Sequence, residues 1–311
     1  MPHLASTALA VTLLAATAYS VPVEQRTNPS TSNLLGFDPD YVHISSANDI
    51  APSIVTHHAA TLHTLVNPSH NLTAPPSRGT AHQKRTNGPD DRYEFTDQSD
   101  YPWRIVGKIQ WSSGVFCSGS LIGPRHVLTA HHCVPTDGSS VTFSPGFDNG
   151  PGPAGSAQVT TAVTTEGCGD GDCVTKCDFA IMIIDQRLGD NLGYFGAVVP
   201  DMNHYNTEGY FETMGYPGDR DNGARPYRQD GNGIPNPGPH AQFTCDSTGP
   251  FYSDSDVAGG QSGSAFWDPN FNVWGALSLR IYGYPNNVEA AAWASGDALV
   301  NTVIGTRNDF A

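Results

Sequence analysis

Short stretches rich in β-branched and aromatic residues follow one another from residue 104 to residue 283 of this 311-residue chain. Clusters such as PGFDNGPGPAG and DGNGIPNPGP separate them, and Gly, Pro, Asn and Asp in such clusters form turns. Many short strands between turns predict an all-β barrel or sandwich. The predicted strands include RIVGKIQW, SGSLI, HVLTA, SVTF, DFAIMIID, FETMGY, HAQFTC, SAFW and VWGALSLRIYG.

The end of the chain has a different period. Apolar residues at 298–300 recur at Val303 and Ile304, which is the spacing that gives a helix one apolar face. We therefore predict one short C-terminal helix over about residues 297–304, closing an all-β domain.

The first 20 residues, MPHLASTALAVTLLAATAYS, form an apolar run that ends in small residues. Ala18 and Ser20 are placed like a cleavage site before Val21. The run is shorter than the roughly 20 apolar residues that a membrane span needs. We therefore predict a signal peptide over 1–20 and a secreted protein that does not cross a membrane.

Residues 21–85 are rich in Pro, Ser, Asn, Thr and His and show no sustained periodicity. This composition predicts a poorly ordered propeptide. The segment ends at the dibasic pair Lys84 and Arg85, which we predict to be a processing site in front of a folded domain over 86–311. The alternative is an ordinary solvated charge pair on a loop.

Composition narrows the class of partner. The formal net charge is −15 and charged residues make up only 14% of the chain. Binding to nucleic acid needs clustered Lys and Arg to neutralise phosphates, so this balance argues against it. Such a charge suits a soluble secreted protein.

Three local patterns carry candidate chemistry. His132 lies directly before Cys133, Asp178 precedes an apolar strand, and Ser262 lies between glycines in GGQSGSAFW. Each alone has a structural explanation, such as a turn or a capped strand. Together they supply the base, carboxylate and nucleophile that acyl transfer needs.

The order of these residues excludes other hydrolases. An α/β-hydrolase places its histidine after its serine, yet no histidine follows His240, and Ser264 replaces the last Gly of G-x-S-x-G. A subtilisin order would need the carboxylate before His132 and a parallel sheet with helices. The strand-rich pattern offers no such helices.

Taken together, CSGSLIGPRHVLTAHHCV, CDFAIMIID, GYPGD and GGQSGSAFW resemble the trypsin-like serine endopeptidases, and most of all their glutamyl endopeptidase branch. The resemblance covers Tyr101 to the C-terminus. It implies two packed antiparallel β-barrels, chymotrypsin-like, over about residues 100–195 and 205–295, with the site in the cleft between them. It also implies a peptidase that acts on polypeptides through an acyl-enzyme without cofactor or metal. We expect a monomer.

By this resemblance His132 is the general base, Asp178 its orienting partner and Ser262 the nucleophile. The neighbouring His131 is the alternative base, but the family places its base against the cysteine, which favours His132. Backbone N–H groups of Gly260 and Ser262 are expected to form the oxyanion hole.

The stretch RIVG at Arg104 resembles the activation cut of a trypsin-type zymogen. Gln261, however, stands where such zymogens carry an Asp for the new N-terminal amine. Only twelve positions separate Ile105 from Cys117, which is too short for a mobile activation segment. We therefore place RIVG in the first barrel strand and expect maturation after Arg85.

The specificity pocket departs from the glutamyl endopeptidases. Leu277 stands where that branch carries a histidine, whereas Ser278 matches the serine that hydrogen-bonds the catalytic Asp. Residues 278–280 are expected to pair with substrate backbone. Asp256 is expected near the pocket floor, where a carboxylate selects Lys or Arg, with Arg280 able to neutralise it.

The family pairs Cys117 with Cys133. The other four cysteines allow three pairings that sequence does not separate: Cys168, Cys173, Cys177 and Cys245. Zinc binding by CGDGDCVTKC is the alternative, but it lacks a C-x₂-C pair and export favours disulfides.

Two other functions compete with the peptidase. A protein of the same fold could bind a partner without catalysis, because folds outlast their chemistry. An esterase could use the same three residues.

Overall fold

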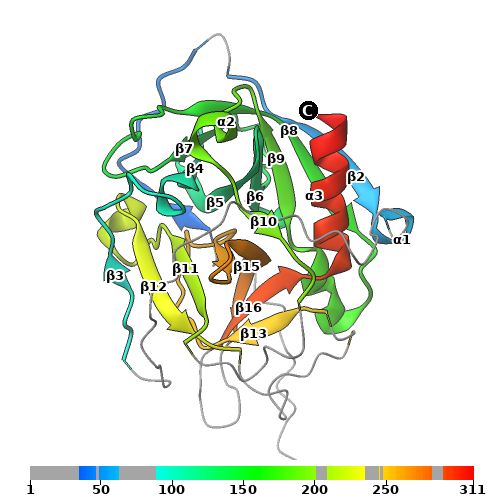
Figure 1. The fold of residues 1–311 in the computed structure, drawn as a ribbon. Helices are drawn as coiled ribbons and strands as arrows, with labels where there is room; N and C mark the ends of the chain where they lie inside the picture. Colours follow the sequence, from blue (N-terminus) through cyan, green and yellow to red (C-terminus); the bar gives the residue numbers. More distant parts are fainter. Residues whose placement is uncertain are drawn as a thin grey trace, which may run out of the picture. The chain divides into compact units, whose positions relative to one another are not determined.

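Two β-sheets form the core of the computed structural model (Figure 1). The structure describes residues 35–46, 49–62, 89–200, 209–234, 245, 248–281 and 290–311. All of them belong to one compact unit, Thr31–Ala311. The predicted signal peptide and the pair Lys84 and Arg85 lie outside the described residues.

The first sheet closes on itself. Each strand pairs antiparallel with the next in the cycle β5–β4–β7–β8–β9–β6, and β6 returns to β5. Closure gives each of these six strands two neighbours and encloses their apolar residues. The six strands are β4 (Val106–Trp111), β5 (Val115–Gly123), β6 (His126–Thr129), β7 (Val141–Pro145), β8 (Ala157–Glu166) and β9 (Ala180–Ile184).

The second sheet is an open half-barrel in the described part of the chain, with the order β13–β16–β15–β14–β11–β12–β3, and β10 pairs parallel with β15. The predicted strand HAQFTC lies outside the described residues except for Cys245. The strands are β3 (Tyr93–Glu94), β10 (Gly196–Ala197), β11 (Phe211–Gly215), β12 (Tyr227–Asn232), β13 (Phe251–Ser253), β14 (Ala265–Trp267), β15 (Asn272–Ile281) and β16 (Ala290–Ser295).

Stacked aromatic rings fill the core of the second sheet. The ring centroid of Phe266 lies 4.6 Å from that of Phe211 and 4.7 Å from that of Trp293. Trp274 meets Phe211 edge to face at 4.9 Å. Such aromatic pairs contribute beyond the area they bury, which gives this small open sheet a rigid core.

The predicted C-terminal helix begins at the predicted residue and is longer than expected: α3 spans Asp297–Asp309. Figure 1 shows this helix beside β8 and β9 of the first sheet. Its Leu299 and Val303 are buried in the core of that sheet. Arg307 then donates to the carbonyls of Ile122 and Phe195. These anchors hold the last helical turns, which the apolar pattern did not reach. Two further one-turn helices are α1 (Ala59–Leu62) and α2 (Gly189–Leu192).

The predicted propeptide is more ordered than its composition indicated. Strand β1 (Gly36–Phe37) pairs antiparallel with β5, and β2 (Ser53–His58) pairs in parallel with residues 161–166 of β8. Strand β7 pairs only with the first residues of β8, so the same edge of β8 is available to another strand further along, at residues 161–166. The expectation of poor order over 21–85 is wrong for these two stretches, because β2 completes that edge.

The bond between Arg104 and Ile105 lies in a 3₁₀ turn, Trp103–Ile105, directly before β4 and not within the strand as predicted. Ile105 is fully buried, and Arg104 Nε donates to the carbonyl of Leu192 at 2.8 Å. The turn Trp103–Ile105 is therefore packed against the first sheet and leads directly into β4.

All six cysteines form disulfides: Cys117 with Cys133, Cys168 with Cys177, and Cys173 with Cys245. The first pair is the one implied by the resemblance. The other two settle the pairing that the sequence left open and leave no thiolate for the zinc alternative.

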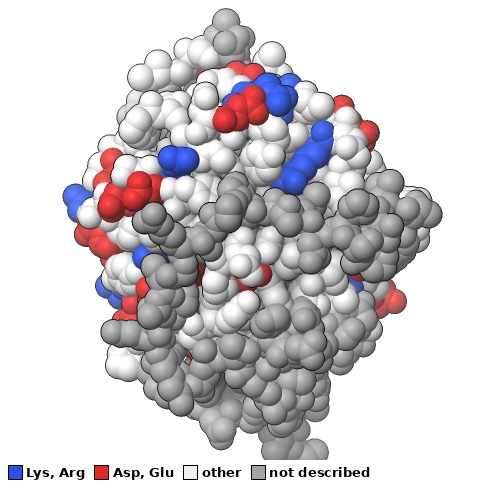
Figure 2. All heavy atoms as spheres, viewed as in Figure 1, with Lys and Arg blue, Asp and Glu red and all other residues white. Residues whose placement is uncertain are grey.

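Charge on the surface is mixed. Figure 2 shows the described Lys and Arg side chains on one face either isolated or beside Asp and Glu, without a continuous basic surface. The ion pair of Arg187 with Asp190, at 2.7 Å, is of this kind. None of the helices in the described residues is long and apolar enough to cross a membrane.

The two disulfides outside the predicted pair should differ in their contribution to stability. Sequence separations of 72 and 9 correspond to about 4 and about 2.5 kcal/mol in the chain-entropy relation. We expect Cys173→Ala with Cys245→Ala to lower the free energy of unfolding more than Cys168→Ala with Cys177→Ala. Denaturant titration of both double variants measures this. An equal or reversed loss would contradict it.

Candidate active site

His132 and Asp178 meet because their strands are neighbours. Strand β6 pairs antiparallel with β9, with Thr129 opposite Ala180. The residues that follow β6 and those that precede β9 therefore lie at one end of the barrel. His132 sits in the 3₁₀ turn His131–Cys133, and Asp178 closes the turn Gly171–Cys177.

The Asp178 carboxylate holds the His132 ring at one nitrogen. The distances from Nδ1 to Oδ1 and Oδ2 are 3.1 and 2.9 Å, and the backbone N of His132 donates to Oδ1 at 3.1 Å. An ionised carboxylate only accepts, so Nδ1 carries the proton. Ser278 Oγ of β15 also donates to Asp178 Oδ2. Both sheets thus orient this carboxylate.

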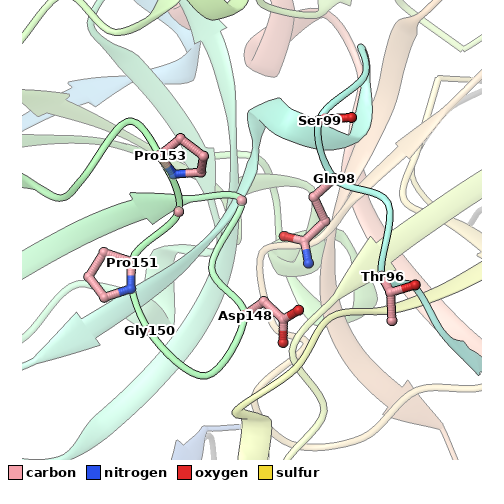
Figure 3. Close-up of a pocket in the computed structure, with 9 residues that line it drawn as sticks. Thr96, Gln98, Ser99, Asp148, Gly150, Pro151 and Pro153 are labelled. Atoms are coloured by element: carbon pink, nitrogen blue, oxygen red, sulfur yellow. The ribbon is translucent and has the colours of Figure 1, made fainter.

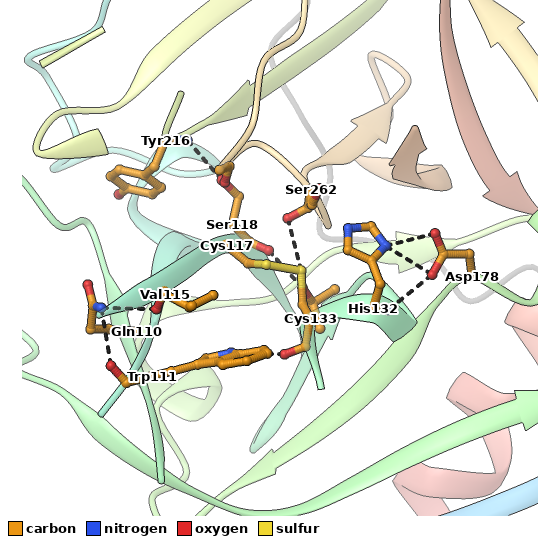
Figure 4. The surroundings of a disulfide bond; sticks show 12 residues. Gln110, Trp111, Val115, Cys117, Ser118, His132, Cys133, Asp178, Tyr216 and Ser262 are labelled. Atoms are coloured by element: carbon orange, nitrogen blue, oxygen red, sulfur yellow. Dashed lines mark hydrogen bonds and ion pairs between the residues drawn. A yellow bond between two sulfur atoms is a disulfide. The ribbon is translucent and has the colours of Figure 1, made fainter. Parts of the chain in front are cut away.

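Ser262 comes from the segment that leads into the second sheet. It lies in the turn before β14 and is 2% exposed, and its carbonyl accepts from Ser118 N of β5 at 2.9 Å. Figure 4 shows the His132 ring between Asp178 and Ser262. In the part of the chain that the structure describes, buried His132 Nε2 has no hydrogen-bond partner. An unpaired buried nitrogen is costly, which is typical of a functional group kept for a reacting partner.

The competing histidine is placed differently. His131 makes no side-chain hydrogen bond with any described residue, whereas His132 is fixed to Asp178. Both histidines line a cavity of about 370 Å³. Its other lining residues are Leu35, Ile54, Trp111, Val134, Thr136 and Thr164, of which the first two belong to the predicted propeptide.

The loop before Ser262 requires glycine. Gly260 has a φ of +92°, and a Cβ there would lie 2.4 Å from the Phe116 ring and 2.5 Å from the carbonyl of Tyr216. The Gly260 carbonyl accepts from Ser118 Oγ at 2.9 Å, and Ser118 Oγ accepts from Tyr216 N at 2.8 Å. The Gly260 N–H has no acceptor among the described residues and is available to an oxyanion.

The predicted pocket residues lie at the start of this loop and in β15. Leu277 is 3% exposed and is buried with Val257 in the aromatic core of the second sheet. The Asp256 carboxylate accepts from Gln229 Nε2 at 2.8 Å and from Asp91 N at 3.2 Å. These two partners come from distant parts of the sequence, so no local pattern could indicate them. Arg280 lies near the end of β15, half-buried and opposite Ala291.

Sequence reasoning also missed Ser118 and Arg92. Ser118 anchors the loop at Gly260 and Ser262, and Arg92 Nη1 donates to Gln261 Oε1 at 2.8 Å. A serine in a strand and an arginine in a polar segment carry no motif. Only the packing of the two sheets brings them to the loop.

A second hollow lies away from these residues. It measures about 260 Å³ and lies between residues 96–99 and the loop 146–153. Figure 3 shows Gln98 and Asp148 projecting into the space between these segments. Its lining includes none of the candidate catalytic residues.

Comparisons with known proteins find relatives among the endopeptidases. A glutamyl endopeptidase from Bacillus licheniformis is 30% identical over 219 residues, which cover 67% of this chain and 63% of the relative. This chain therefore matches less than two thirds of the relative's length.

Solved structures share the fold. A Glu endopeptidase in complex with MPD matches with a TM-score of 0.56 and 24% identity, covering 71% of this chain and 98% of that one. Human heparin binding protein matches with a TM-score of 0.52 and 15% identity, covering 71% and 97%. The predicted chymotrypsin-like fold is confirmed.

The family model described as Trypsin matches residues 93–287, which are more than half of the chain and include strands of both sheets. The resemblance predicted from the sequence motifs is thus confirmed, and the chain belongs to the trypsin family.

Proposed function

We propose that this protein is a secreted serine endopeptidase that uses Ser262, His132 and Asp178. The observation that carries the proposal is the environment of the His132 ring. Asp178 lies 2.9 Å from Nδ1, and the buried Nε2 has no hydrogen-bond partner among the described residues. The ring lies between Asp178 and Ser262 (Figure 4). This is the arrangement that a general base needs.

In the proposed mechanism Ser262 Oγ attacks the carbonyl carbon of a peptide bond as His132 Nε2 takes its proton. Asp178 stabilises the imidazolium that forms. The N–H groups of Gly260 and Ser262 bind the oxyanion, with Ser118 holding the Gly260 peptide in place. His132 then protonates the leaving amine, and water hydrolyses the acyl-enzyme by the same route.

Export and processing form part of the proposal. Three disulfides suit an oxidising compartment, and the apolar segment 1–20 supplies an export signal. The packed turn at Arg104 favours maturation at the dibasic pair Lys84 and Arg85 instead. No cofactor is required by this mechanism.

Labelling with a fluorophosphonate tests the proposal against the non-catalytic alternative. Such reagents phosphonylate a serine only when a base activates it, so the adduct should map to Ser262 by peptide mass spectrometry. A binding protein of the same fold would remain unlabelled. Comparing kcat/KM for matched peptide and ester substrates separates a peptidase from an esterase.

The two histidines should differ sharply in mutants. We expect Ser262→Ala and His132→Ala each to lower kcat by about 10⁶, because triad members act as a unit. The neighbouring His131→Ala should retain most activity, since it leaves the contacts of His132 with Asp178 intact. Steady-state hydrolysis of a peptide substrate measures all three. An inactive His131 variant beside an active His132 variant would reverse the assignment.

Cleavage after Glu should not dominate. The name of the Bacillus licheniformis relative indicates a preference for Glu. A buried carboxylate needs a positive or hydrogen-bonding partner, and the buried side chain of Leu277 offers neither. Mass-spectrometric profiling of a peptide library measures the preference. Strong preference for Glu would overturn this prediction and point to Arg280 as the partner.

The mature enzyme should begin at Thr86 or a few residues later. Arg104→Gln should mature normally, because Arg104 lies in the packed turn before β4. Lys84→Ala with Arg85→Ala should instead accumulate a longer precursor. N-terminal sequencing of active protein from the culture medium decides between the sites, and a terminus at Ile105 would refute processing at Arg85.

A further inference from the structure

The side chain next to the proposed nucleophile has an unexpected partner. Gln261 is 1% exposed, and its Oε1 accepts from Arg92 Nη1 at 2.8 Å and from Ala258 N at 2.9 Å. Arg92 lies directly before β3, about 170 positions earlier in the chain. A distant cation thus reaches the residue that adjoins Ser262.

Arg92 is itself held by two carboxylates. Its Nε and Nη2 donate to Asp90 at 3.0 and 2.7 Å, and its Nη1 and Nη2 donate to Asp219 at 3.2 and 2.7 Å. Its side chain is only 3% exposed. Burial opposes the charge, but the hydrogen bonds with Asp90 and Asp219 outweigh it and raise the pKa of Arg92. The Arg92 guanidinium is therefore permanently charged and held in one orientation by its two carboxylate partners.

Asp91 and Arg92 form hydrogen bonds with both ends of the loop 256–262. Asp91 N donates to the Asp256 carboxylate at one end, and Arg92 donates to Gln261 at the other. Between them, Gln261 N donates to the Ala258 carbonyl at 3.1 Å. The Gly260 peptide, which offers the open N–H, lies inside this clamp.

We propose that Arg92 is a positioning residue for catalysis: it fixes Gln261 and so holds the Gly260 and Ser262 N–H groups in the geometry that binds an oxyanion. The inference rests on the proposed peptidase function. Because Arg92 acts from within the chain, the clamp needs no newly cut N-terminal amine. It is formed while residues 35–62 still pair with the first barrel.

The test compares Arg92→Met with Arg92→Lys and with a matched control, Arg225→Met. Arg225 pairs with Glu94 of the same strand β3 and does not contact Gln261. We expect Arg92→Met to lower kcat about 100-fold with KM changed less than threefold, the range for loss of one oxyanion donor. Arg92→Lys should recover part of the loss, and Arg225→Met should lie within threefold of the parent.

A peptide aldehyde gives a readout that a merely structural role would not move. Its adduct with Ser262 places a negative oxygen in the oxyanion hole, so Arg92→Met should weaken aldehyde binding about 100-fold while the affinity for the matching peptide alcohol stays within threefold. Equal weakening of both ligands, or an unchanged kcat, would overturn the role of Arg92.

Two variants of Gln261 keep the proposal testable if Arg92→Met does not fold. Gln261→Glu retains an oxygen acceptor for Arg92 and Ala258 N, so it should keep kcat within tenfold. Gln261→Leu removes that acceptor and should lose about 100-fold. Similar kcat values for the two would overturn the proposal. A parent protein that neither cleaves peptides nor labels at Ser262 would instead refute the proposed function.

Discussion

The rest of the site depends on the hydrogen bonds of Ser118, because they join β5 of the first sheet to the loop that carries Ser262. Its backbone N donates to the Ser262 carbonyl at 2.9 Å, and its hydroxyl donates to the Gly260 carbonyl at 2.9 Å. The same hydroxyl accepts from Tyr216 N, which follows β11. One residue of β5 thereby sets the position of two segments of the second sheet. A nucleophile and a base from different sheets can face each other only if that join is rigid.

Close packing around Phe116 also restricts which residues the loop before Ser262 can carry. Added Cβ atoms at Gly36, Gly223 and Gly260 would each lie within about 2.4 Å of its ring. The amine of Lys108 also lies 4.3 Å from the ring centroid. Main-chain segments from three regions therefore approach one aromatic side chain as closely as glycine allows. The oxyanion loop is held by hydrogen bonds on one side and by this ring on the other.

Two charged side chains, those of Asp178 and Arg92, also hold residues of the site in place. Asp178 orients the His132 ring, and Arg92 holds Gln261. Both have several hydrogen-bonding partners, which for the buried Arg92 is the condition under which its charge is tolerated. The proposed chemistry therefore rests on fixed dipoles and charges rather than on a bound cofactor.

The sequence by itself determined the fold class, most strands of the first barrel, the start of α3 and the candidate residues His132, Asp178 and Ser262. Local patterns are sufficient there, since strands such as AIMII are apolar throughout and the motifs around each residue are contiguous. Only the tertiary structure decided the rest. Residues AAAWAS of β16 favour a helix by composition, and pairing with β13 and β15 overrides that preference. Three other features also depend on partners distant in the chain: the pairing of β2 with β8, the disulfide between Cys173 and Cys245, and the contact of Arg92 with Gln261. Such contacts form only when packing brings the partners together, so no local pattern of residues specifies them.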